Sequence, residues 1–360
     1  MEFEVQKYLR SNHTIEDLVA EYAIEAREVD GVVSLNYSQI ASPMDEIIPN
    51  ECRGLILEVG TWNVVSRSFR KFYNWGEERA AKIDWNTAKV LEKVDGSLIG
   101  FWYYKGEWRI STKGTPNAGG SCGDNAFTFR DLILLTLKDM GFTLESFTKY
   151  LDPTIFYSFE LCAFENMVII PYDHRELVWL ACWDSVTLEE IDIDTMALQI
   201  PIRKPNKYPT QTIDQLIAAA NAIGKFELEG YVVSDSNLNR IKIKSPAYLA
   251  ADRVMSRLAT PRRLIEFVVM PNYDDVYAIL PPYKQEQVAI IHEQVRVLVN
   301  EINAIFDELK PLAASRKDFA IAATKTKYSS YLFQLLDGKD NETILQKISA
   351  DTIANWIGLK

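Results

Sequence analysis

The stretch Leu91-Glu92-Lys93-Val94-Asp95-Gly96-Ser97-Leu98 places a lysine in a tight turn between apolar runs. Such a lysine can act as a covalent nucleophile if its surroundings hold the side-chain amine uncharged. An exposed hairpin lysine is the alternative interpretation, because a motif as short as Lys-Val-Asp-Gly also arises by chance. The motifs on either side of this turn distinguish the nucleophile from the exposed hairpin lysine.

Basic residues gather near this turn and in one later segment, although the chain as a whole carries a net charge of −11. Residues 50–130 contain 12 Lys or Arg against 9 Asp or Glu, a balance of +3, and residues 240–263 contain 7 against 1, a balance of +6. This distribution indicates that a polyanion docks at specific patches and does not coat the protein. Unevenly spread solvated charge is the alternative.

The nucleophile needs a particular electrostatic environment. An ordinary lysine has a pKa of about 10.4 and is protonated at neutral pH, which prevents attack on phosphorus. Burial and neighbouring positive charges lower the pKa of an amine. We expect Lys93 to be activated in this way, and Asp95-Gly96 to form the sharp turn that presents it at a sheet edge. The cations expected around it are Arg53, Lys71, Lys113, Lys242 and Lys244.

The segment Arg240-Ile241-Lys242-Ile243-Lys244 alternates strictly between basic and apolar residues. In a strand, this pattern puts the three cations on one face and the two isoleucines on the buried face. Cations spaced by roughly 6–7 Å along a strand suit a phosphate chain. A solvated edge strand with protective lysines explains the same pattern equally well.

Two glutamates stand at the ends of apolar runs, Glu160 in Ser158-Phe159-Glu160-Leu161 and Glu229 in Glu229-Gly230-Tyr231. A carboxylate there can hydrogen-bond a ribose hydroxyl, or hold a divalent cation that has few protein ligands, as Mg²⁺ has when it bridges phosphates. A cationic pocket with one or two such carboxylates is a coherent set for phosphoryl transfer. Each glutamate alone is also explained as a surface residue at a strand end.

Other nucleotide-binding motifs are missing. The sequence contains no GxxxxGK[ST] P-loop and no GxGxxG after a strand, and its three histidines form no HExxH motif. P-loop and zinc-hydrolase chemistry therefore find no support.

The first 250 residues carry short apolar runs with turn signals between them, which favours an α+β class with largely antiparallel sheets over a doubly wound parallel sheet. Strands are expected at 55–59, 98–104 and 108–110, further short apolar runs at 167–170, 177–183, 231–233 and 240–244, and helices at 127–140 and 213–223.

After about residue 250 the pattern becomes helical. Apolar residues at steps of three and four predict an amphipathic helix that ends near residue 309; they are Val288, Ile291, Val295, Leu298, Ile302, Ile305 and Leu309. Helix-like segments follow at 319–324, 331–336 and 343–357. We therefore expect two domains, residues 1–250 with the motifs and an all-helical domain over residues 251–360.

The four cysteines show no CxxC spacing, which favours buried free thiols in a reducing cytosol over zinc binding; they are Cys52, Cys122, Cys162 and Cys182. No apolar run reaches the roughly 18 residues that span a bilayer, and the start of the sequence does not resemble a secretory signal. The expectation is a cytoplasmic protein without a membrane partner.

The motifs in chain order resemble those of the T4 RNA ligase 1 family, which are ATP-dependent RNA ligases of the covalent nucleotidyltransferase superfamily. Glu51-Cys52-Arg53-Gly54 precedes the lysine motif, and Phe159-Glu160, Glu229-Gly230-Tyr231 and Lys242-Ile243-Lys244 follow it. The resemblance covers most of the chain, although the last third matches in helical character more than in residues. It implies an N-terminal nucleotidyltransferase domain of the ATP-grasp-like ligase type, followed by a helical domain that is a candidate RNA-specificity module.

The resemblance also implies roles for the matching residues. Lys93 falls on the lysine that carries AMP, and Glu229 on the acidic residue linked to the metal, Mg²⁺ or Mn²⁺. Asp274-Asp275 resembles an acidic pair of the family's helical domain and would add two metal ligands. The implied ATP contacts are Tyr37, Arg53, Lys71, Tyr73, Asp95, Gly96, Lys113, Glu160, Lys242, Lys244 and Tyr248. Two positions depart from the family pattern, Met167 in place of an arginine and Leu161 in place of a phenylalanine.

The implied reaction is ATP-dependent sealing of RNA. Lys93 takes AMP from ATP, AMP passes to an RNA 5′-phosphate, and a 3′-hydroxyl then displaces AMP. The implied partner is RNA with such ends, with nicked tRNA as the family precedent, and the implied source is a phage whose enzyme acts in the host cytoplasm. Two alternatives stay open: a covalent nucleotidyltransferase of the DNA-ligase or capping type, which would carry an OB-fold after the last motif, and a non-catalytic RNA-binding protein on a ligase fold.

Overall fold

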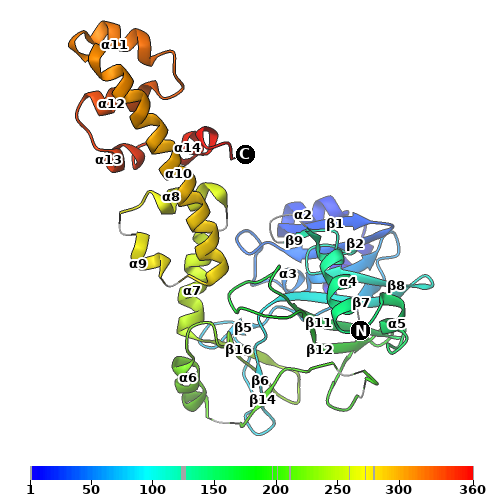
Figure 1. Cartoon of the computed structure of the whole chain (residues 1–360). Helices are drawn as coiled ribbons and strands as arrows, with labels where there is room; N and C mark the ends of the chain where they lie inside the picture. Colours follow the sequence, from blue (N-terminus) through cyan, green and yellow to red (C-terminus); the bar gives the residue numbers. More distant parts are fainter. Residues whose placement is uncertain are drawn as a thin grey trace. The chain divides into compact units, whose positions relative to one another are not determined.

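The computed structural model describes residues 2–122, 127–196, 198–200, 202–210, 212–258, 260–271, 273–278 and 280–359. The chain divides into two compact units, Met1–Tyr248 and Leu249–Lys360. Figure 1 shows the strand-rich first unit in blue to green and the helices of the second unit in yellow to red. The predicted mixed architecture, with antiparallel sheets followed by a helical region, is confirmed.

Three main sheets make up the first unit. The first sheet has the order β1-β2-β3-β4 and is antiparallel throughout. Its strands are β1 (Ile24–Val29), β2 (Val32–Tyr37), β3 (Arg53–Glu58) and β4 (Val64–Ser66). The short strands β9 (Ser121–Cys122) and β10 (Phe127–Thr128) pair only with each other. The short helices of the N-terminal region are α1 (Glu4–Arg10), α2 (Ile15–Tyr22) and α3 (Ile47–Glu51).

The second sheet has the order β13-β12-β11-β7-β8 and buries both of its faces. Its strands are β7 (Ser97–Tyr104), β8 (Glu107–Thr112), β11 (Ile155–Cys162), β12 (Glu176–Asp184) and β13 (Glu190–Ile191). Phe101 and Trp102 are neighbours on β7 and therefore point to opposite faces. Trp102 packs into one core with the first sheet, whereas Phe101 packs into another with α4 (Phe129–Asp139) and α5 (Leu144–Thr148). This sheet is thus the middle layer of the unit.

The third sheet carries most of the predicted motifs and has the order β14-β6-β15-β16-β5. Its strands are β5 (Tyr73–Asn74), β6 (Lys89–Glu92), β14 (Lys207–Tyr208), β15 (Gly230–Ser234) and β16 (Arg240–Lys244), and α6 (Ile213–Ala222) packs on it. The β16–β5 pair is parallel and the other pairs are antiparallel. Ile241 and Ile243 are buried and the three cations between and beside them are half-buried, as the alternation predicts.

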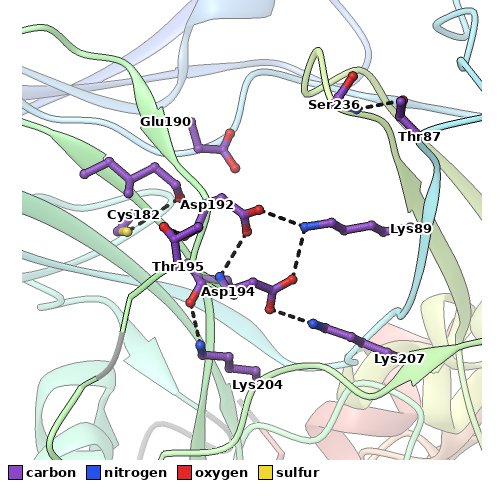
Figure 2. A network of polar contacts seen from close by, with 12 residues as sticks. Thr87, Lys89, Cys182, Glu190, Asp192, Asp194, Thr195, Lys204, Lys207 and Ser236 are labelled. Atoms are coloured by element: carbon purple, nitrogen blue, oxygen red, sulfur yellow. Dashed lines mark hydrogen bonds and ion pairs between the residues drawn. The ribbon is translucent and has the colours of Figure 1, made fainter.

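A network of ion pairs ties β6 to the segment that follows β13 (Figure 2). Lys89 Nζ lies 2.8 Å from Asp192 Oδ2 and 3.1 Å from Asp194 Oδ2, and Lys207 Nζ lies 2.7 Å from Asp194 Oδ1. The lysines are about half-exposed, so each pair contributes little to stability alone. Together the pairs link the second and third sheets next to the strand that leads into Lys93.

The second unit is helical and has its own core. Its helices are α7 (Pro246–Arg257), which begins in the first unit, and α8 (Pro261–Val268), α9 (Tyr273–Tyr277), α10 (Pro282–Leu309), α11 (Arg316–Ala323), α12 (Ser329–Leu336), α13 (Asn341–Leu345) and α14 (Ala350–Trp356), with a 3₁₀ turn over Lys310–Ala314. The periodic residues that predict a helix up to residue 309 lie on α10. No helix in the described part of the chain is both long and apolar enough to cross a bilayer.

Two expectations about elements were wrong. Residues 167–170 form no strand, because the backbone N–H groups of Ile169 and Ile170 turn inward and donate to a buried carboxylate. The segment 343–357 is not one helix but parts of two, since Ser349 caps the second helix by accepting from the N–H of Thr352. The four cysteines are free and buried, as predicted.

Gly230 begins β15 with φ +144°, a conformation that residues with a side chain rarely adopt. An added Cβ would collide with the carbonyl oxygen of Ile243 on β16. We predict that Gly230→Ala lowers the free energy of unfolding by at least about 2 kcal/mol, measured by urea denaturation followed by circular dichroism. The matched control is Gly114→Ala, whose Cβ would meet nothing within 4 Å. A Gly230→Ala protein as stable as that control would contradict the close approach of β15 and β16.

Candidate active site

Lys93 directly follows β6 and continues its pairing with β15. Its backbone N–H donates to the carbonyl of Gly230 at 2.9 Å, one step beyond the pair of Glu92 with Tyr231. The pairing of β6 with β14 covers Val90 and Leu91, so at Lys93 the backbone pairs on the β15 side. From here the chain crosses into β7 of the second sheet, and Asp95 and Gly96 connect the two sheets. The Lys93 side chain is 22% exposed and is not a freely solvated hairpin lysine.

A buried carboxylate holds the Lys93 side chain. Lys93 Nζ donates to Glu229 Oε2 at 2.8 Å, and Lys244 Nζ lies 2.8 Å from Glu229 Oε1. The Glu229 side chain is only 3% exposed, so this carboxylate depends on its two lysine partners. Glu229 precedes Gly230 on β15 and Lys244 ends β16, so the antiparallel pairing of these strands sets the geometry.

Asp95 fixes the backbone just after Lys93. Its Oδ2 accepts from the N–H groups of Ile169 and Ile170 at 2.9 and 2.8 Å, and its Oδ1 accepts from the hydroxyl of Tyr248 at 2.8 Å. The hydroxyl of Tyr172 donates to the Asp95 carbonyl at 2.6 Å. Burial raises the pKa of Asp95, and Glu229 acts in the same direction, while the hydrogen bonds oppose them. Both Asp95 oxygens are thus committed to protein donors, which gives this residue a positioning role.

Gly96 allows the turn to pass close to β11. An added Cβ would collide with the carbonyl oxygen of Leu161 and lie 3.0 Å from Cγ of Glu160. Only a residue without a side chain fits here, so the glycine serves the close approach of two backbones. The same approach brings Glu160 next to Lys93.

Four half-buried cations form a connected group that reaches Lys93 through Lys242, and none of them has an ion-pair partner among the described residues. We call Arg53, Lys71, Lys113 and Lys242 the cation cluster. None of them forms an ion pair with a described residue, whereas Lys93 and Lys244 both do. Lys71 and Lys113 approach the ring of buried Tyr37, with Nζ 4.7 and 4.8 Å from its centroid. Nη1 of Arg53 is buried without a hydrogen-bond partner in the described part of the chain.

Desolvation lowers the pKa of every member of the cation cluster, and neighbouring positive charges add to this effect at Lys113 and Lys242. Burial lowers the pKa of Lys113 to about 8, with Arg53 and Lys71 adding to the effect. Burial likewise lowers the pKa of Lys242 to about 8, and the charges of Lys244 and Lys93 contribute. Burial also lowers the pKa of Lys71 and of Arg53. A polyanion bound here would relieve this cost.

Two acidic side chains, Glu160 and Glu229, are the candidate ligands of a divalent cation. Burial raises the pKa of Glu160 to about 8, with Glu229 contributing and Lys93 opposing, and Glu160 forms no ion pair with a described residue. No cluster of three or more His, Cys, Asp or Glu side chains exists among the described residues. With two carboxyl groups, Glu229 and Glu160 fit a cation of the Mg²⁺ type, which takes one or two carboxylates and completes its shell with phosphate oxygens and water.

The structure brings most of the predicted residues together. Tyr73 also lies near Lys71, whose Nζ is 5.2 Å from its ring centroid. Tyr248, like Asp95, is buried, and Lys244 Nζ lies 4.8 Å from its ring, so both residues support the site from behind. The side chains of the predicted metal ligands Asp274 and Asp275 lie outside the described part of the chain.

Sequence reasoning missed several residues of the site. Tyr172 and the N–H groups of Ile169 and Ile170 gave no signal, because they act through one hydroxyl and through the backbone. Arg67 and Arg70 belong to the basic and aromatic run Arg67-Ser68-Phe69-Arg70-Lys71-Phe72, next to the site residue Lys71. Only Lys71 of that run was predicted as a site residue.

The comparisons with known proteins identify one family. A family model described as RNA ligase matches residues 51–248, more than half of the chain. The chain is 30% identical over 293 residues to a protein named as a bifunctional polynucleotide kinase/RNA ligase in Autographa californica nuclear polyhedrosis virus; the match covers 77% of this chain and 42% of that protein. The chain thus spans less than half the length of this relative.

Two further proteins are similar over most of their length. An RNA ligase of Rhodothermus phage RM378 is 23% identical over 407 residues, which covers 89% of this chain and 90% of that protein. The solved structure of an archaeal ATP-dependent RNA ligase superposes with a TM-score of 0.46 at 14% identity, covering 81% of this chain and 78% of that one.

Glu160 should make stability depend on pH. Its pKa is about 8 in the folded protein against an ordinary 4.5, so the folded state binds the proton more tightly. Its stabilising contribution is therefore complete below about pH 4.5 and is lost as the pH rises through about 8. We predict that Glu160→Gln gains stability over the wild type as the pH rises from 5 to 8.5, by on the order of 1–2 kcal/mol.

Urea denaturation at pH 5.0, 6.5 and 8.5 measures this difference. The control is Glu145→Gln, whose carboxylate is 85% exposed and whose stability difference should not depend on pH. If Glu160→Gln also shows a constant difference, the Glu160 carboxyl is not desolvated.

Proposed function

Because the chain belongs to the RNA ligase family whose model matches residues 51–248, we propose that it is an ATP-dependent RNA ligase. In this proposal residues 1–248 act as a nucleotidyltransferase domain of the ATP-grasp-like ligase type, and residues 249–360 as an RNA-specificity module. The observation that carries the proposal is the cation cluster beside Lys93, which has no carboxylate partners among the described residues. A triphosphate supplies the negative charge that these side chains lack.

The first step forms a protein–AMP bond. The cation cluster holds the phosphates of ATP, and Nζ of Lys93 attacks the α-phosphorus. A nitrogen–phosphorus bond forms, the bond from that phosphorus to the oxygen bridging toward the β-phosphate breaks, and pyrophosphate leaves. Glu229 Oε2, 2.8 Å from Lys93 Nζ, is the atom placed to take the proton. Asp95 and Gly96 hold the backbone of Lys93 in place meanwhile.

A divalent cation, Mg²⁺ or Mn²⁺, fits the carboxylates of Glu229 and Glu160. When bound, it neutralises charge on the phosphate oxygens. Lys244 and Lys242 keep their places on β16, because the strand fixes them from the backbone.

The next two steps move AMP and seal the RNA. An oxygen of the RNA 5′-phosphate attacks the phosphorus on Lys93, the nitrogen–phosphorus bond breaks, and Lys93 regains its proton. A 3′-hydroxyl then attacks the RNA 5′-phosphorus and gives its proton to solvent, the bond from that phosphorus to the oxygen bridging to AMP breaks, and AMP leaves as the phosphodiester forms. We propose nicked tRNA as the RNA and the cytoplasm of a phage host as the location; the likeness to the T4 RNA ligase 1 family and the phage and viral relatives support this.

The nucleophile is tested with ATP labelled at the α-phosphate. We predict that the wild type becomes labelled in a metal-dependent reaction and that Lys93→Ala does not, as seen on a denaturing gel. Lys149→Ala is the control, because this lysine is 69% exposed and pairs only with surface Glu145; it should label like the wild type. Labelled Lys93→Ala would remove Lys93 from its proposed role, and an unlabelled wild type would remove the ligase proposal.

ATP binding should weaken in alkaline solution. Lys113 and Lys242, with a pKa of about 8 each, lose their charge as the pH rises from 7 to 9. Bound phosphates favour the charged lysines, so ATP binding is coupled to protonation above pH 8. We predict that the Kd of ATP for Lys93→Ala, which forms no adduct, rises by roughly tenfold or more between pH 7.5 and 9.5. Titration calorimetry measures it.

Removing one of the two lysines supplies the control. Lys113→Met in the Lys93→Ala background should bind ATP more weakly at pH 7.5 and show a flatter pH profile. A Kd that does not change with pH in either protein would contradict the role of these two lysines.

A further inference from the structure

A basic cavity of the first unit adjoins the candidate active site through Lys71. It has a volume of 590 Å³ and is lined by five cations against two carboxylates, Glu189 and Glu190. We call it the arginine cavity; its cations are Arg67, Arg70, Lys71, Arg79 and Arg240. Lys93, Glu160 and Glu229 do not line it, whereas Lys71 and Tyr73, two of the expected ATP contacts, do.

The protein's own carboxylates leave this cavity positive. Arg240 pairs with Glu190, and Arg70 Nη2 lies 2.9 Å from Oε1 of Glu51. Arg79 is exposed and forms no ion pair with a described residue. Arg67 likewise has no ion pair in the described part of the chain, and its Nε is buried without a hydrogen-bond partner. Nη1 of Arg67 donates to the carbonyl of Leu188, so Arg79 is the exposed cation that an anionic ligand would find here without an ion pair among the described residues.

Aromatic side chains lie among these cations. Phe69 and Phe72 both line the cavity and are half-buried. The guanidinium of Arg240 lies 5.0 Å from the Phe69 ring centroid, and Lys242 Nζ lies 6.0 Å from that of Phe72. Cations that track a phosphate backbone, interleaved with rings on which bases stack, are typical of surfaces that bind single-stranded nucleic acid.

The cavity continues from the nucleophile along one strand. On β16 the face that carries Lys244 and Lys242 also carries Arg240, and each step of two residues advances roughly 6.6 Å. Lys244 pairs with Glu229 beside Lys93, Lys242 belongs to the cation cluster, and Arg240 lines the cavity. An RNA strand whose terminal phosphate lies in the active site would thus meet further cations in the arginine cavity.

We propose that the arginine cavity binds the first nucleotides of the RNA strand whose 5′-phosphate accepts AMP, an inference that rests on the proposed ligase function. The 5′-phosphate must reach the phosphorus on Lys93, so the nucleotides behind it need charge neutralisation and stacking nearby. Lys71 lines the cavity and belongs to the cation cluster. Once pyrophosphate has left, Lys71 can bind an RNA phosphate. The arginine cavity would then act in the transfer of AMP from Lys93 to RNA.

Arg79 is the residue that tests this proposal, because it is exposed and no ion pair in the described structure depends on it. The probe is a 5′-phosphorylated single-stranded RNA of twelve nucleotides, mixed with purified lysyl-AMP protein. We expect Arg79→Gln to form lysyl-AMP within about twofold of the wild type, and to transfer AMP to subsaturating RNA about tenfold more slowly. The slope of log K against log salt concentration for RNA binding should fall in magnitude by about 0.7.

Two further variants separate charge from structure. Arg79→Lys keeps the charge and should recover most of the rate of AMP transfer. Arg27→Gln is the matched control, since Arg27 is exposed on β1 and does not line the cavity; it should behave like the wild type in both steps.

The other outcomes overturn the inference. Normal AMP transfer and an unchanged salt slope in Arg79→Gln would mean that the cavity does not hold the RNA. An equal loss in lysyl-AMP formation would assign the cavity to the phosphates of ATP. A loss confined to the sealing of RNA that already carries AMP would assign it to the 3′-hydroxyl strand. In contrast, a wild type that forms no lysyl-AMP would defeat the ligase function itself.

Discussion

One buried carboxylate organises this site. Glu229 accepts from Lys93 and from Lys244 at 2.8 Å, and its side chain is 3% exposed. A buried carboxylate without partners is strongly destabilising, so the burial of Glu229 requires both lysines to stay at its side. Positive charge also outnumbers negative charge at this site. Glu229 pairs with two lysines, and the cation cluster has no carboxylate partner in the described structure. The fold thus keeps an excess of positive charge near Lys93, which the phosphates of the proposed ligand would balance.

The backbone around Lys93 is held by groups that are distant in sequence. Asp95 gathers two N–H groups from the segment after β11 and the hydroxyl of Tyr248 at the end of the first unit. Gly96 lets this turn lie against β11. The position of Lys93 therefore depends on residues that do not contact a substrate. Asp95 is one of them, and its role is to position Lys93 and not to react.

The sequence predicted those features that depend on local patterns. Alternation between Arg240 and Lys244 predicted the strand and its cationic face, and the heptad-like spacing predicted α10, because both patterns follow from backbone geometry alone. The surroundings of Lys93 could not be predicted, since they depend on which strands pair. A turn between two apolar runs looks the same in a hairpin and in a crossing between sheets. For the same reason residues 167–170 resembled a strand, although their N–H groups serve Asp95.

The position of Lys71 limits the order of events in the proposed cycle. This lysine faces Tyr37 with Lys113 in the cation cluster, and it also lines the arginine cavity. One ammonium group cannot fully neutralise a phosphate of ATP and a phosphate of RNA at the same time. The RNA end would therefore seat completely only after pyrophosphate has left. A fold that shares one cation between two adjoining sites in this way favours adenylation of the protein before engagement of the RNA, without any moving part.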